Sequence, residues 1–241
     1  MKIAVVYIPR VKSTMTHDVL AKHFSLDPWK EPLTISRRSN QSYDEYPELI
    51  RRINTTDNII VKICVNDFID TKNCKILDAY KSIDYSSFDH IVFIKRADVM
   101  GTIASFGHHN LFDPTKWHRK KGEDFKGRTY QIEMTRVFYI LRAYRMFGDI
   151  QNWVANNAGL ARLYDYDFQT VEEHLKNDFA LSESDFDIDI VPMGLDYKNL
   201  ATNYQEVANS IDELYNTIMS VPLNDVNNPK SVFWRENVNF I

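Results

Sequence analysis

The stretch IAVVYIPRVKST, residues 3–14, decides the fold prediction because it joins an apolar run to the expected start of a helix. The run over residues 3–8 stops at Pro9, which is typical of a strand that is buried on both faces of a sheet. Ser13 and Thr14 are residue types that commonly begin helices. A buried strand followed at once by a helix favours a βαβ unit and therefore a parallel sheet.

The same alternation continues along the chain. Apolar runs over 59–65 and 90–94 predict two more buried strands, and a late strand is expected over 160–164. Apolar residues at helical spacing predict helices over 46–53, 76–83, 134–144, 168–179 and 207–218. We find no internal repeat and no low-complexity linker. The sequence therefore predicts a single α/β domain over residues 1–241, with three layers, a central mostly parallel sheet flanked by helices, and a helical second half.

Composition excludes several classes of protein. The chain has 241 residues and seven glycines, none of them among the first hundred residues, so it contains neither a GxGxxG turn nor a GxxxxGK[ST] loop. A net charge of −4 argues against a dedicated nucleic-acid binder. Two cysteines without zinc spacing suggest a reduced compartment, and we expect a cytoplasmic protein. The longest apolar runs are far shorter than the roughly 18 residues that a membrane span needs.

The turn after the first strand, residues 9–15, is the first candidate site. Ligands of parallel sheets collect at the carboxyl ends of strands, and a helix that begins there favours an anion. Arg10 and Lys12 add positive charge, and Ser13 and Thr14 add hydroxyl donors. Phosphate or sulfate is the expected guest. The alternative is an ordinary capped helix with basic neighbours.

The second candidate site is residues 94–105, where the strand over 90–94 again gives way to a helix. Arg96 lies at the strand end and Ser105 lies two turns into the helix, so that together they would grip a second phosphate. The alternative is a strand–helix junction with a surface arginine.

Together the two candidates resemble one family. Pro9-Arg10-x-x-Ser13-Thr14 resembles the PRSGST-type loop of sulfotransferases, which binds the 5′-phosphosulfate of 3′-phosphoadenylyl sulfate (PAPS). The run Arg96…Asp98…Ser105 resembles the family's R-x-D-x(6)-S segment, whose Arg and Ser hold the 3′-phosphate of the donor. The resemblance implies a P-loop-NTPase-like sulfotransferase fold. It also implies a donor site made of Arg10, Lys12, Ser13, Thr14, Met15, Arg96 and Ser105.

Three further segments follow in the order that the family has. Residues 29–32 resemble the "GEP" stretch of bacterial and carbohydrate sulfotransferases, 163–168 resemble the "YEDL" strand end, and 203–207 resemble the "NY-x-E" helix start. The RxGxxGxW motif of the animal cytosolic enzymes is absent. Val11 and Lys12 stand where the family has a small residue and then glycine. Either the loop takes another path, or the charge of Lys12 replaces a backbone contact.

The resemblance implies a reaction. A sulfuryl group would pass from PAPS to a hydroxyl of a carbohydrate or other small acceptor, without a metal, leaving adenosine 3′,5′-bisphosphate. Arg10 and Lys12 would be the cations nearest to the developing charge. Glu31 is the first candidate for the general base, and His108 and His109 are the second. Lys62 interrupts an apolar strand and lies either near the site or at a strand end that reaches solvent.

Two other functions remain open. A nucleotide kinase or other P-loop phosphotransferase needs a lysine just before Ser or Thr, which Lys12-Ser13 supplies without the accompanying glycines. A non-catalytic, sulfotransferase-like binding protein would account for the unusual Val11-Lys12 loop. Acceptor specificity would come from loops 27–45 and 108–130. The second of these is either a lid or binding loop or a solvated basic loop.

Overall fold

The computed structural model describes residues 1–9, 11–33, 45–70, 75–107, 129–186 and 197–220. Its centre is a five-stranded sheet in the order β2-β3-β1-β6-β7, in which every neighbouring pair is parallel. The strands are β1 (Ile3–Tyr7), β2 (Asp27–Trp29), β3 (Ile59–Cys64), β6 (His90–Lys95) and β7 (Arg162–Asp167). The expected parallel sheet is confirmed.

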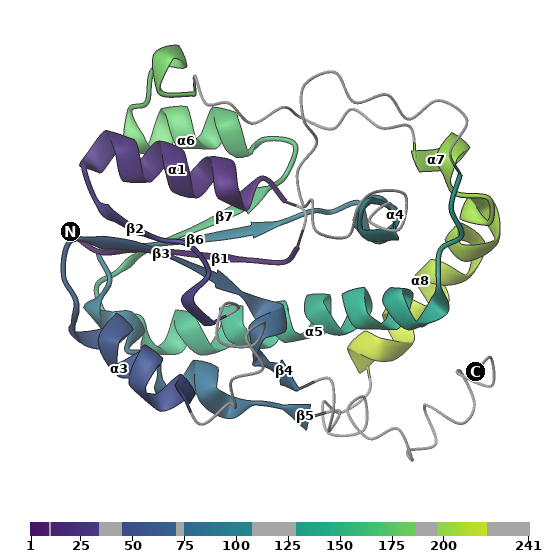
Figure 1. The fold of residues 1–241 in the computed structure, drawn as a ribbon, viewed down its shortest axis with the longest axis horizontal. Coiled ribbons are helices and arrows are strands. Elements are labelled where there is room, and N and C mark those ends of the chain that lie inside the picture. Colours follow the sequence, from purple (N-terminus) through teal and green to yellow (C-terminus); the bar gives the residue numbers. More distant parts are fainter. Residues whose placement is uncertain (10, 34–44, 71–74, 108–128, 187–196, 221–241) are drawn as a thin grey trace.

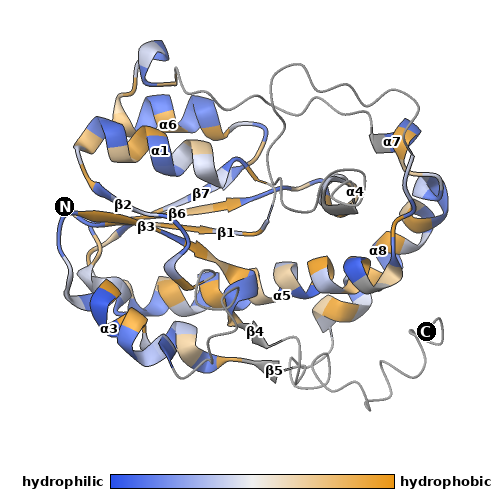
Figure 2. Ribbon diagram, viewed as in Figure 1, coloured by the Kyte–Doolittle hydropathy of each residue, from blue (hydrophilic) through white to orange (hydrophobic). Residues whose placement is uncertain are grey.

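Helices cover both faces of this sheet (Figure 1). One face carries α1 (Ser13–Phe24) and α6 (Val171–Phe179), and the other carries α3 (Tyr46–Thr55) and α5 (Met134–Asn157). Every residue of β1 and β3 is buried, and the central strands β1, β3 and β6 are mostly apolar (Figure 2). The three-layer α/β architecture follows, because strands that are apolar on both sides need a helical layer on each face.

The position of β1 determines where a ligand would bind. β1 lies between β3 and β6, and the chain leaves it through α1 toward the edge strand β2. The connections from β2 to β3 and from β6 to β7 run in the opposite direction across the sheet. Right-handed crossovers therefore place α1 on one face and α3 and α5 on the other. Ligands of such sheets bind at the carboxyl ends where neighbouring connections diverge.

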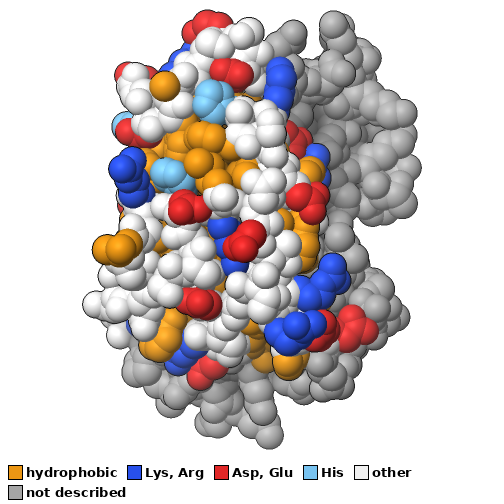
Figure 3. Space-filling view, turned by 90° about the vertical axis from the view of Figure 1, so that its left-hand side faces the viewer, with side chains coloured by type: hydrophobic (Ala, Val, Ile, Leu, Met, Phe, Trp, Pro, Cys, Tyr) orange, Lys and Arg blue, Asp and Glu red, His pale blue; other side chains and the backbone are white. Residues whose placement is uncertain are grey.

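The helices α4 (Val99–Gly107), α7 (Tyr197–Leu200) and α8 (Tyr204–Ser220) lie beyond the carboxyl end of β6 (Figure 1). The view turned by 90° shows the face opposite to them, where one apolar patch with histidines interrupts polar side chains (Figure 3). Ring contacts join Phe24, His90, Tyr164 and Phe179 close to the amino ends of β6 and β7. None of the described helices is both long enough and apolar enough to cross a membrane.

The helix expected over 76–83 is wrong. There, β5 (Lys75–Ile76) pairs antiparallel with β4 (Ile69–Asp70), and the short 3₁₀ segments η3 (Asp78–Ser82) and η4 (Tyr85–Ser87) follow. The Asp84 side chain accepts a hydrogen bond from the Ser86 amide, a local turn that competes with a continuous helix. Buried Tyr80 and Ile83 produce helical spacing without a helix.

Other differences are smaller. The late strand begins two residues after its expected start and runs to residue 167. β2 is not predicted, because its three residues include Pro28 and are too few to show the alternation of apolar and polar residues that marks a strand. Two further 3₁₀ segments, η2 (Val65–Phe68) and η6 (Glu183–Phe186), complete the described elements.

Tyr85 offers a test of core packing. Its side chain is 1% exposed, and its hydroxyl has no hydrogen-bond partner among the described residues. We expect Tyr85→Phe to raise the free energy of unfolding by about 1 kcal/mol, because an orphaned buried hydroxyl is removed. Thermal unfolding would show this as a rise of roughly 2–4 °C in Tm.

Tyr46→Phe is the matched control for this change. The Tyr46 hydroxyl is also buried but donates to the Asp67 carbonyl at 2.7 Å, so its loss should lower Tm. Equal effects of the two substitutions would contradict the assignment of the Tyr85 hydroxyl as unpaired.

Candidate functional site

The loop between β1 and α1 has an unusual backbone at Lys12. Lys12 is the residue before α1 and has φ 57°, in the left-handed region that favours glycine. Val11 beside it is 1% exposed and anchors the loop in the core. Lys12 thus adopts the kind of backbone conformation that a glycine takes without strain, in a turn that also carries an ammonium group.

The first turn of α1 carries backbone amides that can hold an anion. No side chain of the described residues caps it and it contains no acidic residue. Its first helical hydrogen bond runs from the Thr16 amide to the Lys12 carbonyl at 3.0 Å, so the amides of residues 13–15 have no partner within the helix. These N–H groups and the helix dipole favour negative charge at the carboxyl end of β1.

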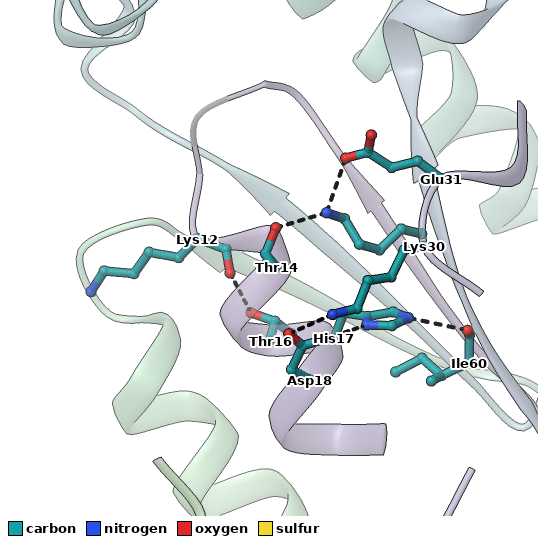
Figure 4. Close-up of polar contacts among 9 residues, drawn as sticks. Lys12, Thr14, Thr16, His17, Asp18, Lys30, Glu31 and Ile60 are labelled. Atoms are coloured by element: carbon teal, nitrogen blue, oxygen red, sulfur yellow. Dashed lines mark hydrogen bonds and ion pairs between the residues drawn. The ribbon is translucent and has the colours of Figure 1, made fainter. Parts of the chain in front are cut away.

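Lys62 connects this turn to Glu31 (Figure 4). Its ammonium donates to Thr14 Oγ1 at 2.8 Å and lies 3.0 Å from Glu31 Oε1. The ammonium that dashed lines join to Thr14 and Glu31 in Figure 4 is that of Lys62. Lys62 is 3% exposed, so the reading of a strand-end lysine that reaches solvent is wrong. A buried charge needs partners of this kind. The only sign of this contact in the sequence was a lysine within an otherwise apolar strand.

Tyr7 contacts the same oxygen of the Glu31 carboxylate as Lys62 does. Its hydroxyl donates to Glu31 Oε1 at 2.6 Å, and the Lys62 ammonium lies 5.1 Å from the centre of its ring. Burial, followed by the nearby Cys64 and Glu31, raises the pKa of the Tyr7 phenol well above its usual value, so Tyr7 stays a hydrogen-bond donor. Glu31 itself has φ 54°, and these contacts help to hold its left-handed backbone.

A second cluster forms around Phe168, which directly follows β7. The Lys12 ammonium lies 5.1 Å and the Arg96 guanidinium carbon 4.9 Å from the centre of the Phe168 ring. Lys12 also pairs with Glu172 of α6 at 2.6 Å, and Arg96 pairs with Asp98 at 3.0 Å. The loops after β1, β6 and β7 therefore bring two of the predicted donor-site cations to one aromatic ring.

Backbone contacts fix the segment that carries Arg96. The Tyr144 hydroxyl donates to the Arg96 carbonyl at 2.6 Å, and Asp167 at the end of β7 accepts from the Ala97 amide at 2.6 Å. Asp98 then caps α4 by accepting from the Gly101 amide at 2.8 Å. A Cβ at Gly101 would lie 2.1 Å from Asp98 Oδ2 and 2.2 Å from Arg96 Nη2, so the Arg96–Asp98 pair occupies the space that this glycine leaves open.

The remaining predicted residues are less accessible or lie elsewhere. Ser13, Met15 and Ser105 are 6%, 8% and 4% exposed, so any contact of their side chains with a ligand needs local rearrangement. Arg10, His108 and His109 lie outside the described residues, as do residues 108–128 of the expected binding loop.

A third set of contacts ties α1 to the segment that carries Glu31 (Figure 4). No pattern in the sequence indicated these contacts. His17 is fully buried, with Nδ1 2.8 Å from Asp18 Oδ1 and Nε2 3.3 Å from the Ile60 carbonyl. The Lys30 ammonium donates to Asp18 Oδ2 at 3.0 Å. Because Lys30 directly precedes Glu31, this chain of contacts restricts where Glu31 can lie.

Among the described residues, Lys12, Lys62 and Arg96 can hold anionic groups, and Glu31 can accept a proton. Within the described part of the chain, no three His, Cys, Asp or Glu side chains are grouped so as to share a metal ion. Comparison with known proteins adds no assignment, since no family model and no curated protein matches the sequence.

Asp18 makes a pH-dependent contribution to stability. Burial raises the pKa of its carboxyl, but hydrogen bonds and charge from His17 and Lys30 outweigh burial and hold the pKa below its ordinary value. A depressed pKa stabilises the folded chain above the unfolded pKa of about 3.9, and this stability is lost as pH falls through the folded pKa.

We expect Asp18→Asn to lower the free energy of unfolding by about 1 kcal/mol at pH 7, a modest value because solvent screens the pair. The difference from wild type should shrink below about pH 4. Denaturant unfolding between pH 3 and 7 measures it, with Asp212→Asn on the exposed side of α8 as the control. A difference that is constant with pH would contradict this account.

Two helical glycines allow a matched test of the Arg96 segment. A Cβ at Gly148 of α5 would meet nothing within 4 Å, so Gly148→Ala should stabilise the chain by about 1 kcal/mol. Gly101→Ala should show less gain or a loss, because its methyl group displaces the Asp98 carboxylate from the cap and from Arg96. Equal gains in denaturant unfolding would show that the Arg96–Asp98 pair does not occupy this space.

Proposed function

We propose that the protein is a PAPS-dependent sulfotransferase that acts on a hydroxyl of a carbohydrate or other small acceptor. The observation that carries the proposal is the contact chain Thr14–Lys62–Glu31 at the first turn of α1, which has no side-chain cap among the described residues. It places a buried ammonium between the helix end that favours an anion and the carboxylate that the sequence resemblance implies as base.

The donor side is supported by the loop geometry. The amides of residues 13–15 suit the 5′-phosphosulfate, as the resemblance to the PRSGST-type loop implies. Arg96, at the end of the neighbouring strand, suits the 3′-phosphate. A P-loop-NTPase-like sulfotransferase fold is consistent with a central parallel β1 whose chain passes directly into the helix of the anion site.

Transfer would need a base and a cation close to the sulfuryl group. The acceptor oxygen bonds to sulfur while the bond between sulfur and the bridging phosphate oxygen breaks, and that electron pair leaves with the bisphosphate. Glu31 would take the hydroxyl proton, with Tyr7 and Lys62 holding its Oε1 in place. Lys62, already within reach of Thr14, would stabilise negative charge at the transferred group, a role that the resemblance gives to Arg10 and Lys12.

A non-catalytic binding protein is the second candidate. The observation that favours it is that the carboxylate of Glu31, the proposed base, already pairs with Lys62 and accepts a hydrogen bond from Tyr7. The nucleotide-kinase alternative receives less support, because Lys12-Ser13 lacks the glycines that accompany the lysine of a P-loop.

Thermal shift with adenosine 3′,5′-bisphosphate tests the donor site. At 100 times its dissociation constant the ligand should stabilise the chain by about 2.7 kcal/mol, roughly 5–10 °C in Tm for a chain of this size. Arg96→Ala should require more ligand for the same shift, because one phosphate partner is lost. Absence of a shift for wild type at millimolar ligand would overturn the donor site.

Transfer of labelled sulfate from PAPS to a panel of hydroxyl acceptors tests catalysis. Glu31→Gln should lower kcat by about 10²–10⁴-fold while bisphosphate binding persists, and Glu213→Gln on α8 is the exposed control. Binding of the bisphosphate without transfer to any acceptor would favour the non-catalytic protein.

A further inference from the structure

Each described cation of the candidate site forms an ion pair with a carboxylate side chain of the protein. Lys12 pairs with Glu172, Arg96 with Asp98 and Lys62 with Glu31. Two of these carboxylates have other tasks, since Asp98 caps α4 and Glu31 is the proposed base. Glu172 has no such task, and its carboxylate side chain is 45% exposed.

The Lys12–Glu172 pair joins two elements that are far apart in sequence. Lys12 precedes α1, whereas Glu172 lies in the first turn of α6, which packs beside α1 on the same face of the sheet (Figure 1). In Figure 4 the Lys12 side chain extends away from Thr14 and from the ammonium between Thr14 and Glu31. The pair therefore holds the Lys12 ammonium on the α6 side of the loop.

We propose that Glu172 gates the anion site by competing with the ligand for Lys12. This inference rests on the proposed function and names a regulation of the same site. A bisphosphate at the first turn of α1 places its negative charge beside Lys12 and draws the ammonium from Glu172. Loss of the Lys12–Glu172 ion pair then removes a contact between the loop and α6. Ligand binding therefore loosens the first turn of α6.

The size of the effect follows from the exposure of the pair. The two side chains are 27% and 45% exposed, so solvent screens their attraction. Pairs of this kind change an equilibrium by about two- to fivefold when one charge is removed. Glu172 therefore modulates affinity and does not abolish binding.

Glu173 provides the matched control. It lies in the same first turn of α6 and is exposed, so Glu173→Gln changes net charge and the helix dipole in the same way as Glu172→Gln. The two variants differ in the direct contact with Lys12.

Calorimetric titration with adenosine 3′,5′-bisphosphate tests the gate at about 20 mM and 500 mM salt. Glu172→Gln should bind about two- to fivefold more tightly than Glu173→Gln at low salt, and the advantage should shrink at high salt. Hydrogen exchange should show that ligand slows the α1 amides and speeds those in the first turn of α6 in wild type. Glu172→Gln should lack the second change.

The outcomes separate the gate from the proposed function. Binding by wild type with equal affinity in both variants overturns the gate and leaves the donor site standing. Measurable binding by Glu172→Gln alone supports the gate in a stronger form. Failure of all three proteins to bind overturns the gate together with the donor site.

Discussion

The buried ammonium of Lys62 is the constraint on which the carboxyl end of the sheet depends. An unpaired charge at 3% exposure would cost several kcal/mol, so the surroundings must supply partners. Thr14 and Glu31 do so, and Tyr7 completes the arrangement by donating to the same carboxylate oxygen. One lysine in a central strand thus fixes the start of α1, the end of β1 and the segment after β2 relative to each other.

Sequence patterns predicted the parts of the fold that are governed by burial on both faces. β1 is a continuous apolar run, β6 is apolar between its first and last residues, and β3 is apolar except at Lys62. Runs of this kind have few stable alternatives to the interior of a sheet. The start of α1 at Ser13 agrees with its prediction, although the residue before it is a left-handed Lys12 without a side-chain cap. The helix expected over 76–83 failed because local turn contacts and strand pairing overrode an apolar spacing.

Individual residues of the candidate site could be predicted from the sequence, but the contacts between them could not. Local patterns identify Lys12 and Arg96, because strand ends and helix starts are local features, whereas Glu31 was expected only from the resemblance to sulfotransferases. Two of the pairings are distant in sequence: Lys62 is 48 residues from Thr14, and Lys12 is 160 residues from Glu172. Such contacts depend on the strand order, which places the ends of β1, β3 and β6 side by side and which no local pattern determines.

The scarcity of glycine has different consequences at the two strand–helix junctions. After β6, Gly101 leaves room for the Arg96–Asp98 pair, and any Cβ would displace it. After β1, Lys12 takes a left-handed backbone that costs a non-glycine residue about 1–2 kcal/mol. That cost is partly offset by the contacts of its side chain with Glu172 and Phe168. A lysine in place of glycine therefore exchanges backbone freedom for a charge whose position depends on α6.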